Sequence, residues 1–182
     1  MKKIMMLTAS VMALSLPAAQ LAHAESDAAM IKNAQMAAPA AVAKDATIYA
    51  MGADGKLKTL REGKSGWWCM PNDPSTPGND PMCGDANAMA WAGAWMGHTA
   101  PPAGKVGFMY MLQGGPVGSN MDPYATKPAA GEKWVATGPH IMIVGSKGTM
   151  AGYASGGNHP DTTKPYIMWE GTPYEHLMIP IK

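Results

Sequence analysis

The chain has little charge, and the charge it has is not clustered. Charged residues make up 15% of its 182 residues, well below the roughly 25% typical of globular proteins. Arg61 is the only arginine, and no run of basic residues occurs. Binding to nucleic acid or to an anionic membrane surface depends on grouped basic side chains. Neither is therefore an expected partner.

Long hydrophobic runs are also lacking. No segment approaches twenty consecutive apolar residues, so no membrane span is expected. The longest apolar run, residues 4–16, follows two lysines and precedes a small-x-small site at residues 22–24. This pattern predicts a signal peptide over residues 1–24. The first cysteine is Cys69, too far along the chain for a lipid anchor. We expect export to the periplasm, with the extracellular space as the alternative.

The usual core residues are scarce as well. Leu, Ile, Val and Phe number only seventeen after residue 24, a content that alone is typical of disorder. Fourteen methionines, six tryptophans and six tyrosines over the same residues compensate. Methionine fills irregular gaps but defines geometry loosely, so a further constraint is expected. In an oxidising compartment, a Cys69–Cys83 disulfide would supply one, contributing about 3 kcal/mol for a loop of about 15 residues.

The hydrophobic pattern predicts one α+β domain over residues 46–182, with a mainly antiparallel β-sheet and one tryptophan-bearing helix packed on it. The helix is expected over residues 86–96, where Asp85 suits the N-cap and Gly97 the C-terminal position. Trp91 and Trp95, four residues apart, share its sheet-facing side.

Strands are expected at residues 47–51, 57–61, 105–112, 133–136, 140–144, 166–169 and 176–181. Pro180 is typical of the end of an edge strand. The four prolines between the cysteines predict a rigid loop. Residues 25–45 are rich in alanine and weakly periodic, so we expect a flexible leader or fraying helix outside the core.

Five segments resemble those of a family of small exported bacterial proteins. They are Leu60-Arg-Glu-Gly63, Pro77-Gly-Asn-Asp-Pro-Met-Cys83, Tyr110-Met-Leu-Gln-Gly-Gly115, Ser119-Asn-Met-Asp-Pro-Tyr-Ala-Thr126 and Pro173-Tyr-Glu-His-Leu-Met-Ile-Pro180. The likeness runs from about residue 58 to the C-terminus. The resemblance implies that this region is one unit, and it assigns no catalytic residue to the chain.

Candidate metal ligands come from histidine and methionine. Four histidines follow the signal peptide, namely His98, His140, His159 and His176, and Met96 lies close to the first. Imidazole combined with thioether sulfur suits copper, particularly the reduced ion. None of the histidines forms a local motif such as His-Glu-x-x-His, so a site would require distant segments to converge. For each histidine a structural or surface role is the simpler interpretation, as core filling is for the methionines.

The cysteine spacing matches neither a zinc-ligand pair nor a two-residue redox motif, which favours a structural disulfide over a copper or redox role. We expect a non-catalytic exported protein that binds a small ligand, a metal ion or an envelope protein.

The alternative function is a small hydrolase using His140, His159 or His176. Glu175 and Asp161 are the neighbouring carboxylates, but adjacent residues on a strand point to opposite faces, which separates Glu175 from His176. Ser119 does not lie in a Gly-x-Ser-x-Gly motif. No catalytic residue is therefore assigned. The loops at residues 113–127 and 154–164 are the most promising functional segments.

Overall fold

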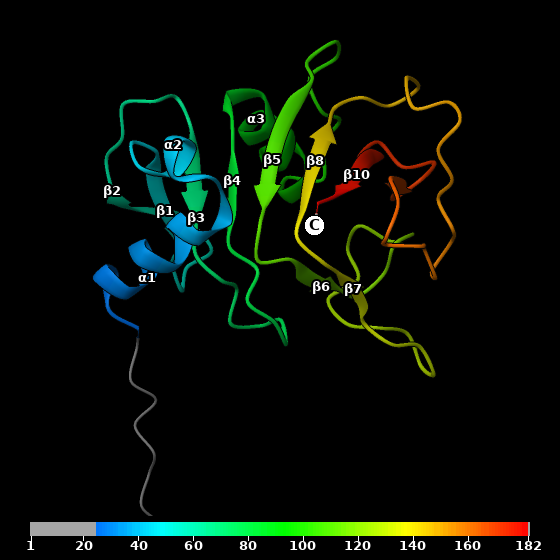
Figure 1. Cartoon of the computed structure of the whole chain (residues 1–182), viewed down its shortest axis with the longest axis horizontal. Helices are drawn as coiled ribbons and strands as arrows, with labels where there is room; N and C mark the ends of the chain where they lie inside the picture. The colour runs from blue at the N-terminus through cyan, green and yellow to red at the C-terminus, as the bar shows by residue number, and fades with distance from the viewer. Residues whose placement is uncertain (1–24, 182) are drawn as a thin grey trace, which may run out of the picture.

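An eight-stranded sheet forms the centre of the protein (Figure 1). The structure is a computed structural model, and it describes residues 25–181; the expected signal peptide lies outside the described residues. The strands are β1 (Thr47–Met51), β2 (Leu57–Arg61), β3 (Trp68–Met70), β4 (Met82–Gly84), β5 (Gly107–Met111), β6 (Gly115–Val117), β7 (Val135–Thr137), β8 (His140–Val144), β9 (Tyr166–Met168) and β10 (His176–Pro180).

The strand order is β2-β1-β3-β4-β5-β8-β10-β9, and β6 and β7 form a separate two-stranded sheet. Neighbouring strands are antiparallel except β1 and β3, which run parallel. The predicted α+β class with a mainly antiparallel sheet is confirmed. The strands predicted at residues 47–51 and 57–61 both form and pair as a hairpin, and Gly55 adopts the positive φ of 74° that its turn requires.

The predicted helix is α3 (Ala86–Met96). The Asp85 side chain caps it by accepting a hydrogen bond from the Ala88 amide at 2.8 Å. Trp91 is buried against the sheet, and Trp95 packs partly buried beside it. The orientation predicted from their four-residue spacing is therefore confirmed.

On the opposite face of the sheet, the segment at residues 25–45 covers β1, β3 and β4 through α1 (Asp27–Ala34), the short 3-10 helix η1 (Gln35–Ala37) and α2 (Ala40–Ala43) (Figure 1). Ala34 and Ala37 are completely buried there beside Ile48 of β1. The expectation of a leader outside the core is wrong. Alanine gives little hydrophobic periodicity, yet its small side chain lets a helix approach a sheet closely.

The disulfide predicted between Cys69 and Cys83 is present, with an Sγ–Sγ distance of 2.02 Å. The two residues lie directly opposite each other on β3 and β4. These short strands were not expected, since the prolines between them predict only a loop. The disulfide therefore links neighbouring strands at the centre of the sheet.

The edges of the sheet are β2 and β9. β10, whose Pro180 suggests an edge strand, instead lies between β8 and β9. β9 pairs only with residues 176–178, so Pro180 has a strand on one side alone, opposite His140. This local geometry explains how proline is accommodated. On the outer side of β9, the Ile167 amide donates to the Ala154 carbonyl at 2.9 Å.

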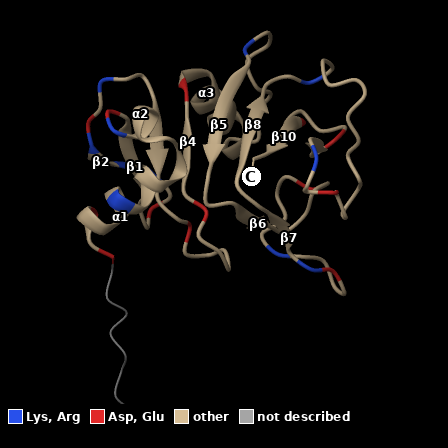
Figure 2. Ribbon diagram, in the orientation of Figure 1, with Lys and Arg blue, Asp and Glu red and all other residues tan. Residues whose placement is uncertain are grey.

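Charged side chains lie mainly around the β1–β2 hairpin, on α1 and on the loops (Figure 2). The central strands β5, β8 and β10 carry no Lys, Arg, Asp or Glu. Within residues 25–181, no helix has the length and apolar character needed to cross a membrane.

Candidate functional site

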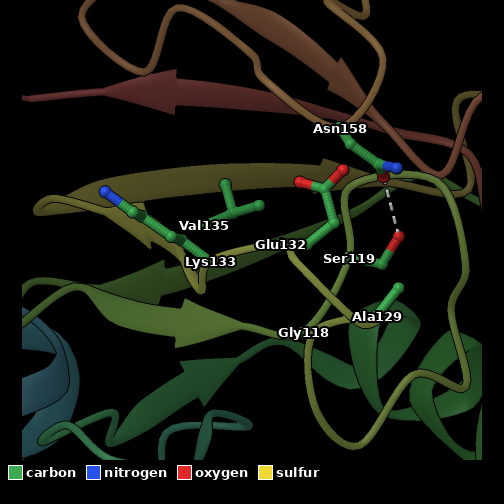
Figure 3. Close-up of a pocket in the computed structure, with 7 residues that line it drawn as sticks. All are labelled: Gly118, Ser119, Ala129, Glu132, Lys133, Val135 and Asn158. Carbon is green, nitrogen blue, oxygen red and sulfur yellow. Dashed lines mark hydrogen bonds between the residues drawn. The ribbon is translucent and has the colours of Figure 1, made fainter.

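A cleft lies between the segment at residues 118–136 and the loop at residues 158–162. It consists of two adjoining hollows, one of about 30 Å³ and one of about 280 Å³, which share Lys133, Val135 and Asn158. Ser119 and Glu132 line the smaller hollow (Figure 3), whereas Trp134 and His159 line the larger one. The cleft thus combines hydroxyl, amide, imidazole, ammonium, carboxylate and indole groups.

Strands β6 and β7 hold one wall of the cleft. They pair antiparallel with Val117 opposite Val135, and the Thr137 hydroxyl donates to the Gly115 carbonyl. A side chain at Gly118 would meet the Ala125 carbonyl at 2.6 Å, so only glycine permits this close approach. The pairing and the tight turn position Ser119 and Glu132 on the same wall.

Ser119 bridges the two walls of the cleft. Its hydroxyl donates to Asn158 Oδ1 at 3.0 Å (Figure 3) and accepts hydrogen bonds from the Met121 and Asp122 amides, both at 3.0 Å. The latter contacts are typical of a serine that stabilises a turn. Ser119 is therefore held by backbone amides and an amide side chain.

Asn120 locks the two loops together from the interior. Its side chain is completely buried, and its Nδ2 donates to the carbonyls of Ser155 at 3.0 Å and Gly157 at 2.8 Å. The Trp169 amide donates to the Asn120 carbonyl at 2.7 Å. These hydrogen bonds hold the loops that contain Asn120 and residues 155–157 against the protein interior. The cleft is therefore formed without a ligand.

His159 lies at the mouth of the larger hollow. Its Nε2 is 3.4 Å from Glu132 Oε2, and the side chain is 79% exposed. Asp161, the carboxylate close to it in the sequence, instead interacts with Thr163 and Lys164. Hydrogen bonds from Thr163, and then from Lys164, lower the pKa of Asp161 to about 2. The Glu132 carboxylate points toward Asn158, while Lys133 extends the opposite way (Figure 3).

His140 and His176 lie far from solvent on the face of the sheet that packs against α3. Because β8 and β10 are antiparallel, the two histidines begin their strands at opposite ends of the sheet. The Nδ1 of His140 is 2.7 Å from the Gly138 carbonyl, and that of His176 is 2.8 Å from the Tyr174 carbonyl. A carbonyl can only accept, so each Nδ1 carries the proton.

Burial makes both imidazoles neutral. Desolvation lowers the pKa of His176 to about 4, although the hydrogen bond to Tyr174 opposes the shift, and a protonated His140 would add to it. Desolvation also lowers the pKa of His140. Neutral imidazoles of this kind hold a lone pair on Nε2.

The remaining candidate ligands lie near the C-terminal end of α3. Met96 is 46% exposed, and the His98 ring stacks on Tyr124 with centroids 4.0 Å apart. Thus His98 and His159 lie outside the face shared by His140 and His176. Within residues 25–181, no group of three or more His, Cys, Asp or Glu side chains is arranged to hold a metal ion. The metal assignment of the histidines and Met96 stays a prediction.

The cleft contains residues that the sequence did not single out, namely Glu132, Lys133, Trp134 and Asn158. They belong to loops with no local motif, and only the pairing of β6 with β7 brings them opposite the later loop. The sequence feature that could have pointed to this cleft is the Gly and Asn content of the two loops. The chain matches no protein-family model, no curated protein sequence and no solved structure, so its function has to be inferred from its own residues.

Proposed function

We propose that this chain is an exported, non-catalytic binding protein whose cleft between residues 118–136 and 158–162 holds a small, hydroxyl-rich ligand such as a saccharide unit. The expected signal peptide and the disulfide support export. The observation that carries the proposal is the pair of adjoining hollows sharing Lys133, Val135 and Asn158.

The chemistry of the cleft favours a ligand with several hydroxyl groups. The Glu132 carboxylate accepts hydrogen bonds, Lys133 donates them, and Asn158 can do both. Trp134 adds an indole surface on which the apolar face of a sugar ring can pack. The larger hollow, about 280 Å³, lies just below the usual size range of small-molecule sites. A small ligand therefore fits better than a peptide or a large cofactor.

The hydrolase alternative has less support from the same geometry. His140 and His176 are buried away from the cleft. His159 faces Glu132, but the Ser119 hydroxyl donates to Asn158 and not to a histidine. A nucleophile needs contact with its general base. Binding without chemistry is thus the better-supported function.

Amide chemical-shift mapping tests the proposal. Isotope-labelled protein spanning residues 25–182 would be titrated with a panel of mono- and disaccharides, with free amino acids as a comparison set. A saccharide should shift resonances from residues 118–136 and 158–162. Glu132→Gln, which removes the charge and keeps the shape, should weaken binding about tenfold, the loss expected for one charge-assisted hydrogen bond.

The matched control is Glu62→Gln, an exposed carboxylate that follows β2 and lies outside the cleft. It should bind the same saccharide as tightly as the unaltered protein. The proposal is overturned if no saccharide shifts these resonances, or if Glu132→Gln and Glu62→Gln bind alike.

A further inference from the structure

The face of the sheet that packs against α3 is rich in methionine. Met109, Met142 and Met178 lie in register across β5, β8 and β10. Met168 of β9 lies directly opposite His176 of β10. All four methionines are buried in the cluster beneath α3. Four methionines therefore lie on the buried face that also carries His176.

His176 presents a bare nitrogen to this interior. Its side chain is 1% exposed, and its Nδ1–H donates to the Tyr174 carbonyl, which leaves the lone pair on Nε2. Among the described residues, Nε2 has no hydrogen-bond partner. Buried polar atoms in native proteins nearly always have a partner. The nitrogen is therefore oriented and available for a ligand.

The strand register places two methionines next to this histidine. Opposed residues of an antiparallel pair have Cβ atoms about 5 Å apart, which is the relation between His176 and Met168. Met178 is two residues along the same face of β10, a separation of about 7 Å between Cα atoms. Methionine side chains are long and flexible enough to turn toward a shared point.

Aromatic rings enclose the same position. The centroids of the Trp91 and Trp169 rings are 5.3 Å and 5.0 Å from the centroid of the His176 ring. Trp169 has a φ of 57°, a left-handed conformation that is a genuine outlier for a bulky residue. Backbone strain of this kind persists only where surrounding contacts enforce it, and it clusters at ligand sites.

We propose that His176 Nε2 and the thioethers of Met168 and Met178 bind one Cu(I) ion, with Trp91 and Trp169 covering it. Soft thioether ligands with imidazole suit Cu(I), whereas protein ligands of Zn(II) are Cys thiolate, His, Asp and Glu, not Met. A histidine ligand whose other nitrogen donates to a backbone carbonyl is the usual arrangement in metal sites. The indole faces can further stabilise the positive charge. This site is separate from the cleft and does not depend on its ligand.

Anaerobic titration with Cu(I), buffered by a chromogenic Cu(I) chelator, tests the site. Each addition is equilibrated until tryptophan fluorescence is constant, because the ligands are buried. The protein should take up one equivalent of Cu(I) and lose part of its tryptophan fluorescence. Met168→Leu and Met178→Leu keep the hydrophobic volume, and each should weaken Cu(I) binding at least tenfold. Zn(II) should compete weakly.

The matched control is Met150→Leu, a buried methionine in the separate cluster with Ile167 and Leu177. It should bind Cu(I) as tightly as the unaltered protein, with no change in circular dichroism in any of the three variants. The proposal fails if Cu(I) is not retained against the chelator, the result expected if buried water alone satisfies His176. It also fails if the three leucine variants bind alike.

Discussion

The two faces of the central sheet are packed by opposite means. On one face, over β1, β3 and β4, five buried alanines from residues 34–46 lie against Ile48 and the Cys69–Cys83 disulfide. On the other, α3 and the later loops bring methionine, tryptophan and tyrosine side chains against the sheet. The small alanine side chains allow the segment to pack closely against the sheet. Large flexible ones fill a wider space with more adjustable contacts.

The two faces also differ in their buried polar groups. Among the described residues, the buried side-chain atoms without a hydrogen-bond partner are Trp91 Nε1, Asn120 Oδ1, Tyr166 OH and His176 Nε2. Three of these residues pack in or against the cluster beneath α3, and none belongs to the alanine-lined face. In the described part of the chain, the alanine-lined face therefore leaves no buried side-chain polar atom without a partner, whereas the methionine-lined face leaves several.

Removing the disulfide should give the largest effect on the alanine-lined face. The Cys69→Ala/Cys83→Ala protein should lose about 3 kcal/mol of unfolding free energy, equivalent to roughly 6–12 °C in melting midpoint. Calorimetry with and without reductant measures this. Reductant should lower the midpoint of the unaltered protein and leave that of the double variant unchanged. An unaltered protein indifferent to reductant would contradict the prediction.

Acid should destabilise the methionine-lined face by a similar amount. The pKa of His176 is about 4 in the folded protein and about 6.5 in the unfolded chain, so only the unfolded chain takes up the proton between these values. Neutral His176 contributes fully to the free energy of unfolding above about pH 6.5. About 3 kcal/mol of this free energy is lost as the pH falls to about 4. His140 acts in the same direction.

Urea unfolding of metal-free protein across this pH range measures the loss. The buried Tyr166 belongs to the same cluster, and because burial raises its pKa, its phenol stays protonated throughout this range. The lowered pKa of Asp161 acts only below its ordinary value of 3.8. Constant stability between about pH 6.5 and 5 would refute a buried neutral His176.

Enlarging a small residue should disturb the alanine-lined face to an intermediate degree. Ala43 is 1% exposed on α2, and Ala43→Leu should cost about 1–3 kcal/mol through overpacking. Ala41→Leu, at an exposed position of the same helix, should change the unfolding free energy by less than about 0.5 kcal/mol. Equal effects in chemical denaturation would show that residues 25–45 do not pack on the sheet in solution.

The smallest effect is expected where the packing is most adaptable. Met142→Leu conserves volume in the methionine-lined cluster and should cost less than about 1.5 kcal/mol. Chemical denaturation of metal-free protein checks this value. A larger loss would mean that this face is as tightly specified as the alanine-lined one, and the contrast between the two faces would then disappear.

The structural features predicted best from the sequence are those that depend on residues a few positions apart. Asp85, Gly97 and the Trp91–Trp95 spacing describe α3 correctly because capping and helical periodicity act over a few residues. The short strands β3 and β4 were missed because their stability comes from pairing with β1 and β5, far away in the sequence. The alanine-rich helices were missed because burial of alanine leaves almost no hydrophobic pattern.

The candidate sites depended even more on long-range structure. His140 and His176 were identified from the sequence, but only the register of β8 and β10 shows that they share a face at opposite strand ends. Met168 became relevant only through its position opposite His176. Glu132 and Asn158 approach each other through two loops without a motif. Residue type alone could suggest copper chemistry, but it could not select the ligands.

The two edges of the sheet have a consequence for self-association. Exposed strand edges are templates for growth into larger sheets, and natural proteins block them with cations, short strands or covering loops. Here β2 carries Lys58 and Arg61, and Lys58 pairs with Asp27 at 3.0 Å. At the other edge, β9 has three residues, and its outward Ile167 amide is already bonded to Ala154. A chain so poor in charge is thereby protected from edge-to-edge aggregation.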